Sequence, residues 1–243
     1  MTRRQCLMLL AVCPSIAATA DDPWATVLRT AVDDQGRIDF TRLQAAPAAL
    51  DAAVAAIARE APNNAPARFP TSADRIAFHI NTYNALAMAH VIRSGIPRRL
   101  SLLDRMQFFK LSDVVVGGRS ISLYDYENDV IRPLGEERVH FALNCMAVSC
   151  PRLPRTPFTA ANLDAELDAA ARLFFSEPRN LQLDPARKIV RLSSILDFYT
   201  GDFLKRAPTL IGYANRYVGP PIPDDFRVRF IPYDWTINAR LSP

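Results

Sequence analysis

Residues 139–151 read VHFALNCMAVSCP. The stretch holds His140, one of three histidines in the chain, together with Cys145 and Cys150, the two cysteines that lie outside residues 1–20. Its apolar body is typical of a buried segment, yet thiol and imidazole groups are the side chains best suited to nucleophilic chemistry. We therefore expect this stretch to lie at the centre of the fold and of any active site.

The spacing within this stretch argues against a simple pairing of its thiol and imidazole. In a strand, His140 and Cys145 point to opposite faces, and in a helix their separation of five residues also aligns them poorly. A direct Cys145–His140 pair therefore requires a bend near Asn144, or a base supplied by another part of the chain. Cys150, next to Pro151, is an alternative reactive thiol.

The first twenty residues have the pattern of a secretory signal peptide. Arg3 and Arg4 precede the apolar run 6–11, and Ala18-Thr19-Ala20 offers small residues before a cleavage site. The run is too short for a membrane-spanning helix. We predict an exported protein, periplasmic or extracellular, with residues 1–20 as signal peptide; a lipoprotein anchored through Cys13 is the minor alternative.

Cleavage at this site leaves Cys145 and Cys150 as the only cysteines. In an oxidising compartment an even pair is first suspected of being a disulfide. A turn over 146–149 brings two α-carbons within the roughly 4.4–6.8 Å that a bridge needs. A reactive thiol and two inert buried thiols remain the other interpretations.

Composition indicates an ordinary globular protein. Hydrophobic residues make up 49% of the 243 residues and charged residues 22%, and we expect residues 21–243 to form a single domain. The formal net charge of +4 is small and evenly spread, which argues against a nucleic-acid partner. The expected partner is a small-molecule, peptide or cell-envelope ligand.

Periodicity predicts a mainly helical α+β fold with a small, mostly antiparallel sheet. A long helix is expected from a cap at Thr71 or Ser72 to Gly95, because apolar residues recur there at the helical period. Gly117-Gly118 between two alternating runs predicts a hairpin over 111–123. Two further strands are predicted at 188–192 and 226–231.

The long helix carries two asparagines beside its apolar stripe. Asn81 and Asn84 lie on the same flank, and a buried amide requires hydrogen-bond partners. They either satisfy neighbouring backbone groups or belong to a site.

Several other chemistries lack their sequence signatures. His79 and His90 are eleven residues apart on one helix, about 16 Å along its axis, and so cannot share an ion. No His-Glu-x-x-His, Cys-x-x-Cys or Gly-x-Ser-x-Gly motif occurs. We therefore expect no metal site and no cofactor.

Five blocks of this chain together resemble the bacterial family known as domain of unknown function 547, whose members are often exported. They span about residues 76–238, the family-like core, in the expected order. The blocks are FHINTYNAL at 78–86, ISLYDYE at 121–127, RVHFALNCMAVSCP at 138–151, DFYTGDF at 197–203 and YDWTIN at 233–238.

The resemblance comes with two departures and one wider similarity. His79 stands where the family commonly has tryptophan, and Asn128 stands where it commonly has histidine, which puts any activity of the family in question here. The Cys/His pattern is loosely similar to that of papain-like and transglutaminase-like thiol enzymes.

Two functions follow from these residues. In the first, the chain is a thiol hydrolase or acyl-transferase acting on an amide or ester. Its predicted catalytic residues are Cys145 as nucleophile, His140 as base and Glu127 as an orienting group. In the second, it is a non-enzymatic binding or structural domain stapled by a Cys145–Cys150 disulfide. The residues predicted to bind substrate are Asn81, Asn84, Asn144 and Asp234.

Overall fold

The computed structural model describes residues 22–240, so the predicted signal peptide at residues 1–20 lies outside the described residues. The predicted α+β class is confirmed: helices dominate, and the strands form one two-stranded and one three-stranded sheet. The α-helices are α1 (Pro23–Ala31), α2 (Phe40–Ala45), α3 (Ala48–Arg59), α4 (Ser72–Arg93), α5 (Leu102–Met106), α6 (Leu123–Asp125), α7 (Leu163–Ser176), α8 (Ser194–Phe198), α9 (Thr200–Phe203) and α10 (Leu210–Ala214). The strands are β1 (Asp113–Val116), β2 (Arg119–Ser122), β3 (Leu181–Asp184), β4 (Ile189–Ser193) and β5 (Arg227–Ile231).

Helix α4 confirms the predicted long helix. Thr71 and Asp74 form a capping box at its start, in which each side chain accepts a hydrogen bond from the other's backbone N–H. Gly95, at φ 76°, follows its last turn and adopts the left-handed conformation that glycine tolerates. Both ends are therefore set by local sequence, and its apolar stripe enters the first of the two large hydrophobic cores among the described residues. A third, small cluster consists of Cys145, Ala147 and Cys150.

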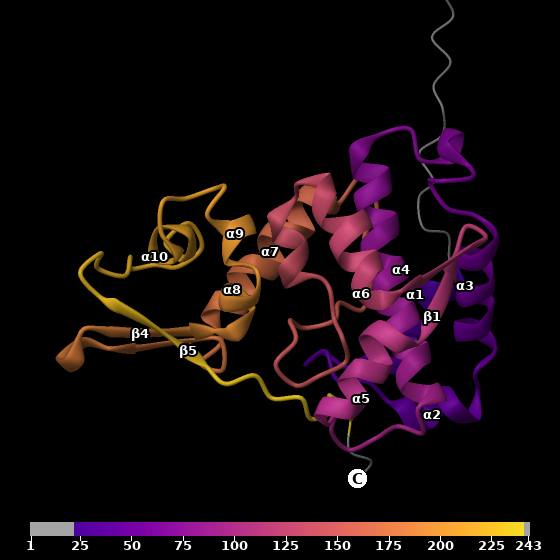
Figure 1. The fold of residues 1–243 in the computed structure, drawn as a ribbon, viewed down its shortest axis with the longest axis horizontal. Coiled ribbons are helices and arrows are strands. Elements are labelled where there is room, and N and C mark those ends of the chain that lie inside the picture. Colours follow the sequence, from indigo (N-terminus) through magenta and orange to yellow (C-terminus); the bar gives the residue numbers. More distant parts are fainter. Residues whose placement is uncertain (1–21, 241–243) are drawn as a thin grey trace, which may run out of the picture.

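The first core lies among α1, α3 and α4, at the right of Figure 1. The predicted β1–β2 hairpin covers this core and is confirmed, with Gly117 and Gly118 both at positive φ in its turn. The same turn binds α3, because the N–H of Gly117 donates to the carbonyl of Ile57 and that of Gly118 to Ala58. A side chain at Gly117 would collide with Asn63, so this position requires glycine.

The second core forms around Phe141, at the left and centre of Figure 1. Its ring packs against Phe174 and Phe175 of α7 and against Phe203 of α9. The three-stranded sheet has the order β3-β4-β5. Because β3–β4 and β1–β2 are antiparallel and β4–β5 is parallel, two of the three strand pairings are antiparallel, as predicted.

The chain between the two cores has little regular structure. Residues Glu137–Phe141 form a 3-10 helix, η5, which places Val139 in the first core and Phe141 in the second. After β5 the chain returns to the first core, where Thr236 pairs with Arg99. The predicted single domain over residues 21–243 stays a prediction, since its outermost residues lie beyond the described range.

Two helical segments contain π-helical turns, which the sequence did not indicate. They are η2 (Gln107–Leu111), continuous with α5, and η3 (Tyr126–Ile131), continuous with α6. Such turns insert one extra residue per turn and are frequent at functional sites. Within residues 22–240, no helix is both long and apolar enough to cross a membrane.

Candidate functional site

A pocket of about 320 Å³ opens between the two cores. Both thiols, the only imidazole of the central stretch, one carboxylate, one guanidinium and several aromatic rings line it. The lining residues are Tyr83, Phe109, Tyr124, Glu127, Asn128, Arg132, His140, Leu143, Cys145, Cys150, Ile195, Phe198, Tyr199, Tyr233 and Trp235. The lining therefore comes from two parts of the chain, residues 83–150 and residues 195–235.

The two cysteines are free thiols and form a pair at the bottom of the pocket. Their sulfurs are 2.8 Å apart, and the backbone N–H of Cys145 donates to the sulfur of Cys150 at 3.1 Å. The Tyr233 hydroxyl lies 3.1 Å from the sulfur of Cys150 and 3.4 Å from that of Cys145. The two sulfurs thus lie in contact with each other and with one shared hydroxyl.

Asn144 shapes the loop that brings the thiols together. Its side-chain oxygen accepts from the N–H of Met146 at 2.7 Å, and its amide donates to the carbonyl of Pro151 at 2.6 Å. Met146, with φ 69°, turns the chain back. A side-chain amide thereby takes the hydrogen bonds that a strand or helix would have made, which explains why neither forms here.

The hydrogen bonds within the pair separate the two thiols by acidity. Burial raises the pKa of Cys150, but hydrogen bonds from the Cys145 thiol, the Tyr233 hydroxyl and backbone N–H groups outweigh it and leave the pKa lowered. The hydrogen bond to Cys150, followed by burial, raises the pKa of Cys145 well above its ordinary value. Cys150 is therefore the more acidic thiol of the pair.

His140 presents one nitrogen to a carboxylate and leaves the other without a partner. Its Nε2 lies 3.1 Å from Oδ2 of Asp202, while its buried Nδ1 has no hydrogen-bond partner. The ring stacks on Tyr199 with centroids 3.8 Å apart. The hydrogen bond with His140 is the main cause that lowers the pKa of Asp202, so the carboxylate is ionised and accepts from Nε2–H.

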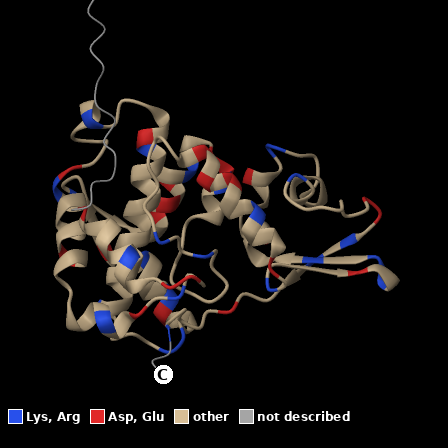
Figure 2. Ribbon diagram, turned by 180° about the vertical axis from the view of Figure 1, so that it is seen from behind, with Lys and Arg blue, Asp and Glu red and all other residues tan. Residues whose placement is uncertain are grey.

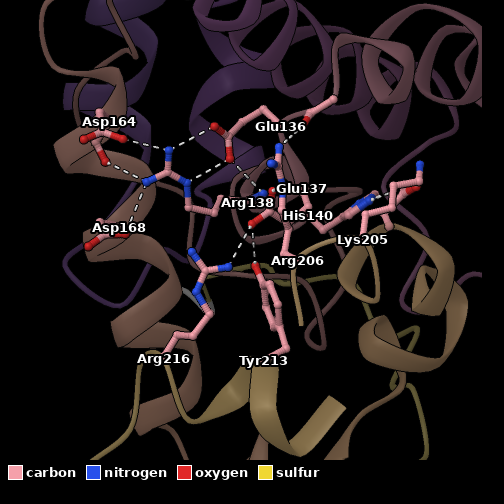
Figure 3. Close-up of polar contacts among 12 residues, drawn as sticks. Glu136, Glu137, Arg138, His140, Asp164, Asp168, Lys205, Arg206, Tyr213 and Arg216 are labelled. Atoms are coloured by element: carbon pink, nitrogen blue, oxygen red, sulfur yellow. Dashed lines mark hydrogen bonds and ion pairs between the residues drawn. The ribbon is translucent and has the colours of Figure 1, made fainter. Parts of the chain in front are cut away.

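An ion-pair network anchors η5, which carries His140. Figure 3 shows Arg138 reaching Glu136 at 2.8 Å and two carboxylates of α7, Asp164 at 2.7 Å and Asp168 at 3.2 Å. On the other side, Glu137 accepts from Arg206 at 2.8 Å. The backbone that carries the imidazole is therefore fixed from two directions.

Glu127 reaches His140 through a tyrosine. The Tyr199 hydroxyl donates a short hydrogen bond to Glu127, and the Tyr199 ring stacks on His140. Arg132 donates to Asp202 at 2.7 Å and to Asn128 at 2.6 Å. These contacts form one connected polar wall from η3 to α9.

The structure brings the three predicted catalytic residues, Glu127, His140 and Cys145, into one pocket, together with Cys150. The bend that a shared His140–Cys145 site requires is present, because η5 ends at Phe141 and the chain turns through a loop before Cys145. The expected link from Glu127 to His140 is indirect, since Asp202 contacts the imidazole instead.

The four residues predicted to bind substrate do not line this pocket. Asn81 binds the indole N–H of Trp24 and the backbone of Phe158, and Asn84 binds the backbone of Ala142 and Asn144. Asn144 closes the thiol loop as described above. Asp234 is exposed and accepts from the N–H of Thr236. Their polar groups hold the backbone, which was the alternative interpretation for the asparagines of α4.

Sequence reasoning missed Asp202, Tyr199 and Tyr233 as site residues. All three fall in the blocks DFYTGDF and YDWTIN, but nothing in the local sequence shows which distant histidine or cysteine they contact. One signal was available for Asp202: it is an acidic residue in a helix that also contributes apolar residues to a core. In the structure it is 9% exposed.

The two positions that depart from the family pattern lie in different surroundings. His79 is buried in the first core, where its Nδ1 lies 2.6 Å from the Tyr126 hydroxyl, and burial lowers its pKa to about 4. Asn128 lines the pocket and binds Arg132 and the carbonyl of Tyr124. Asn128 is thus the departure that bears on the site.

Among residues 22–240, no group of three or more His, Cys, Asp or Glu side chains is arranged to hold a metal ion. Figure 2 shows acidic and basic residues interspersed along the ribbon, in line with the even spread of charge in the sequence.

The family comparison agrees with the resemblance in the sequence. Residues 68–175 match the family model described as "Protein of unknown function, DUF547". The match covers fewer than half of the 243 residues and includes α4, η3 and the thiol loop, but ends before Tyr199, Asp202 and Tyr233. Comparison with curated proteins and with solved structures gives no match.

Proposed function

We propose that the pocket is the active site of a thiol hydrolase or acyl-transferase that acts on an amide or ester. The Cys145–Cys150 pair supplies the nucleophile and His140 the general base. The observation that carries this proposal is the imidazole itself. Its Nε2 is held by an ionised carboxylate, and its buried Nδ1 has no partner, while His140 and both cysteines line the same pocket.

The reaction proceeds in two acyl-transfer steps. His140 Nδ1 takes the thiol proton, and the thiolate attacks the carbonyl carbon, forming a C–S bond and placing the negative charge on the carbonyl oxygen. Collapse breaks the C–N or C–O bond, and the leaving group takes the proton from His140. A water molecule then gives a proton to His140 and cleaves the thioester to the acid; an amine or alcohol acceptor makes the same step a transfer.

The hydrogen bonds favour Cys150 as the attacking sulfur, because a lowered pKa gives more thiolate at neutral pH. Cys145, the nucleophile predicted from the sequence, is the more exposed of the two at 8% against 1%. In this arrangement the Cys145 thiol donates a hydrogen bond to Cys150 and stabilises the thiolate that forms when His140 takes the proton. Exchanging each cysteine for serine separates the two roles.

The other polar residues of the pocket act on His140. Asp202 fixes the tautomer that leaves the lone pair on Nδ1, in the manner of the third residue of a catalytic triad. Glu127 holds the Tyr199 ring against the imidazole, so we assign it a positioning role. Burial and the Glu127 carboxylate raise the pKa of Tyr199 well above its ordinary value, so the phenol stays protonated and continues to donate.

Alkylation of the native, unreduced protein tests this function. Iodoacetamide is added at neutral pH, and the modified cysteine is located by mass spectrometry. A single fast-reacting cysteine whose rate falls in His140→Ala supports a thiol nucleophile. Modification that starts only after a reductant is added would mean that the cysteines form a disulfide, and it would contradict the proposed thiol nucleophile. Hydrolysis of 4-nitrophenyl acetate by the wild type and by Cys145→Ser and Cys150→Ser then identifies the attacking sulfur.

The sulfur distance favours a second candidate function. At 2.8 Å the two sulfurs need only a small movement to reach the roughly 2.05 Å of a disulfide bond. In the oxidised form, a Cys145–Cys150 disulfide would stabilise a binding pocket in a non-enzymatic domain. The same alkylation experiment separates the two, because the disulfide-bonded protein gives no modification without a reductant.

We also propose that the protein is exported, on the strength of residues 1–20. A fusion of residues 1–25 to an enzyme that folds only in the periplasm gives activity if this segment directs export. A fusion in which Arg3 and Arg4 are replaced by glutamate, which removes the positive charge of the signal, should lose that activity.

A further inference from the structure

A cluster of large apolar side chains lies exposed on α5 and η2. Leu103 is 80% exposed, Leu102 67%, Leu111 65% and Met106 42%. We call these four residues the α5 surface. Soluble proteins scatter single exposed apolar residues, whereas contiguous ones mark interaction sites. Figure 1 shows α5 at the lower edge of the helical part, away from β4 and β5.

The exposure of the α5 surface is built into the fold. Phe108 points inward, is 1% exposed and packs against His90 with ring centroids 4.5 Å apart. Leu100, 2% exposed, anchors the segment before the helix. These two anchors fix the helix, so the four apolar side chains on its other side have no route into the core.

The segment that carries the α5 surface is basic. Residues 98–111 carry four basic residues and one acidic residue, Asp104, for a net charge of +3. Arg98, Arg99 and Lys110 are exposed, and Arg105 lies over the Trp235 ring at 4.6 Å. Exposed apolar side chains on a basic segment are typical of surfaces that lie in the interface of an anionic bilayer.

We propose that the α5 surface binds the protein to membranes that contain anionic lipids, with the leucines inserted among the headgroups and the cations paired with phosphates. Charge decides between this occupant and a second copy of the chain. A symmetric dimer through the same face would bring both sets of cations together, whereas an anionic bilayer neutralises them.

The membrane-bound face adjoins the pocket. Phe109 of η2 and Trp235, on which Arg105 lies, both line it. The pocket would therefore open next to the headgroup layer. Binding to the membrane does not depend on the pocket being catalytic, so the two proposals fail separately.

Vesicle binding tests the inference. The purified protein is mixed with vesicles of phosphatidylglycerol and phosphatidylcholine in equal amounts, or of phosphatidylcholine alone, and sedimented. We expect the protein to bind the mixed vesicles. Added salt should weaken this binding by about fivefold for each cation whose charge it screens. The double variant Leu102→Asp/Leu103→Asp should bind at least about tenfold more weakly. The matched control Leu183→Asp changes a leucine of β3 that is 45% exposed and should bind like the wild type.

Three results would overturn the inference. They are wild-type protein that stays in the supernatant with the mixed vesicles, equal loss of binding in Leu183→Asp, and a dimer that the double variant converts to monomer. Light scattering detects the dimer. Because all three leucines are exposed, circular dichroism should show an unchanged fold in each variant. The Trp235 environment gives a second readout, since insertion next to Arg105 alters its fluorescence.

Discussion

Two buried histidines of this chain differ in what their partners do to them. His79, in the first core, is 6% exposed and bonds the hydroxyl of Tyr126. His140, between the cores, is 3% exposed, bonds the carboxylate of Asp202 and leaves Nδ1 without a partner. The residue type and the degree of burial are the same, and each imidazole also has a tyrosine beside it.

The difference lies in the charge of the hydrogen-bond partner, which is a neutral hydroxyl for His79 and a carboxylate for His140. A hydroxyl can satisfy a neutral imidazole, and burial without a compensating charge lowers the pKa of His79 to about 4. An ionised carboxylate stabilises the imidazolium that a general base must become. We therefore base the proposed role of His140 on its carboxylate partner and not on its burial, which it shares with His79.

The largest effect is expected from removing the imidazole at the pocket. His140→Ala should lower the rate of 4-nitrophenyl acetate hydrolysis by about 10³-fold, the usual size of a general-base contribution. The control is His79→Gln, which removes a buried imidazole that does not line the pocket and should retain the activity. Equal loss in both variants would mean that fold stability, and not chemistry, explains the result.

Between pH 6.5 and 4 the pH dependence of stability should come from two buried histidines, because burial lowers the pKa of both His90 and His79 to about 4. The share of His79 can be isolated by mutation. The pKa of His79 lies below the ordinary 6.5, so the unfolded chain binds the proton first and stability is lost as pH falls from 6.5 to about 4. The loss amounts to about 3 kcal/mol at the acid end of this range. Urea unfolding across this range measures it. In His79→Gln, which keeps an acceptor for Tyr126, this part of the pH dependence should vanish; an unchanged slope would contradict the assignment.

Replacing the carboxylate that holds His140 should cost less than removing the imidazole. Asp202→Asn offers Nε2 an amide without charge, and we expect hydrolysis to slow by about 10²-fold. Rates are compared with those of Asp168→Asn, which removes a carboxylate from the Arg138 network but leaves the imidazole bond intact. A rate equal to that of the control would show that Asp202 has a structural role only.

The smallest effect is expected at Glu127, because it acts through Tyr199. Glu127→Leu and Tyr199→Phe each remove the same hydrogen bond and should each lower the rate about tenfold or less. The double variant should be no slower than either single variant, as expected for two residues in one contact. Additive losses would indicate that Glu127 contacts substrate directly.

The parts of the fold that local chemistry dictates were predictable. The capping residue Thr71, the apolar period of α4 and the terminal Gly95 lie within one helix, and the two glycines of the hairpin determine its turn. The pairing of β4 with β5 was not predictable in this way, because a parallel pairing joins segments that no turn connects.

Some residues of the candidate site were likewise predictable from the sequence and others were not. His140, Cys145 and Cys150 were found because they share one short stretch with few histidines or cysteines elsewhere. Asp202, 62 positions after His140, could not be assigned, because only the packing of α9 against Phe141 brings it to the imidazole. The asparagines of α4 show the converse error, in which an unusual residue serves the backbone.

The hydroxyl of Tyr233 reaches the thiols from near the end of the described chain. It joins residues 83 and 88 positions apart, and contacts of such long range close long loops. A chain in which the segment after β5 has not docked lacks this partner for its two sulfurs. Refolding under reducing and under oxidising conditions therefore tests whether the hydroxyl contact forms before a Cys145–Cys150 bond does.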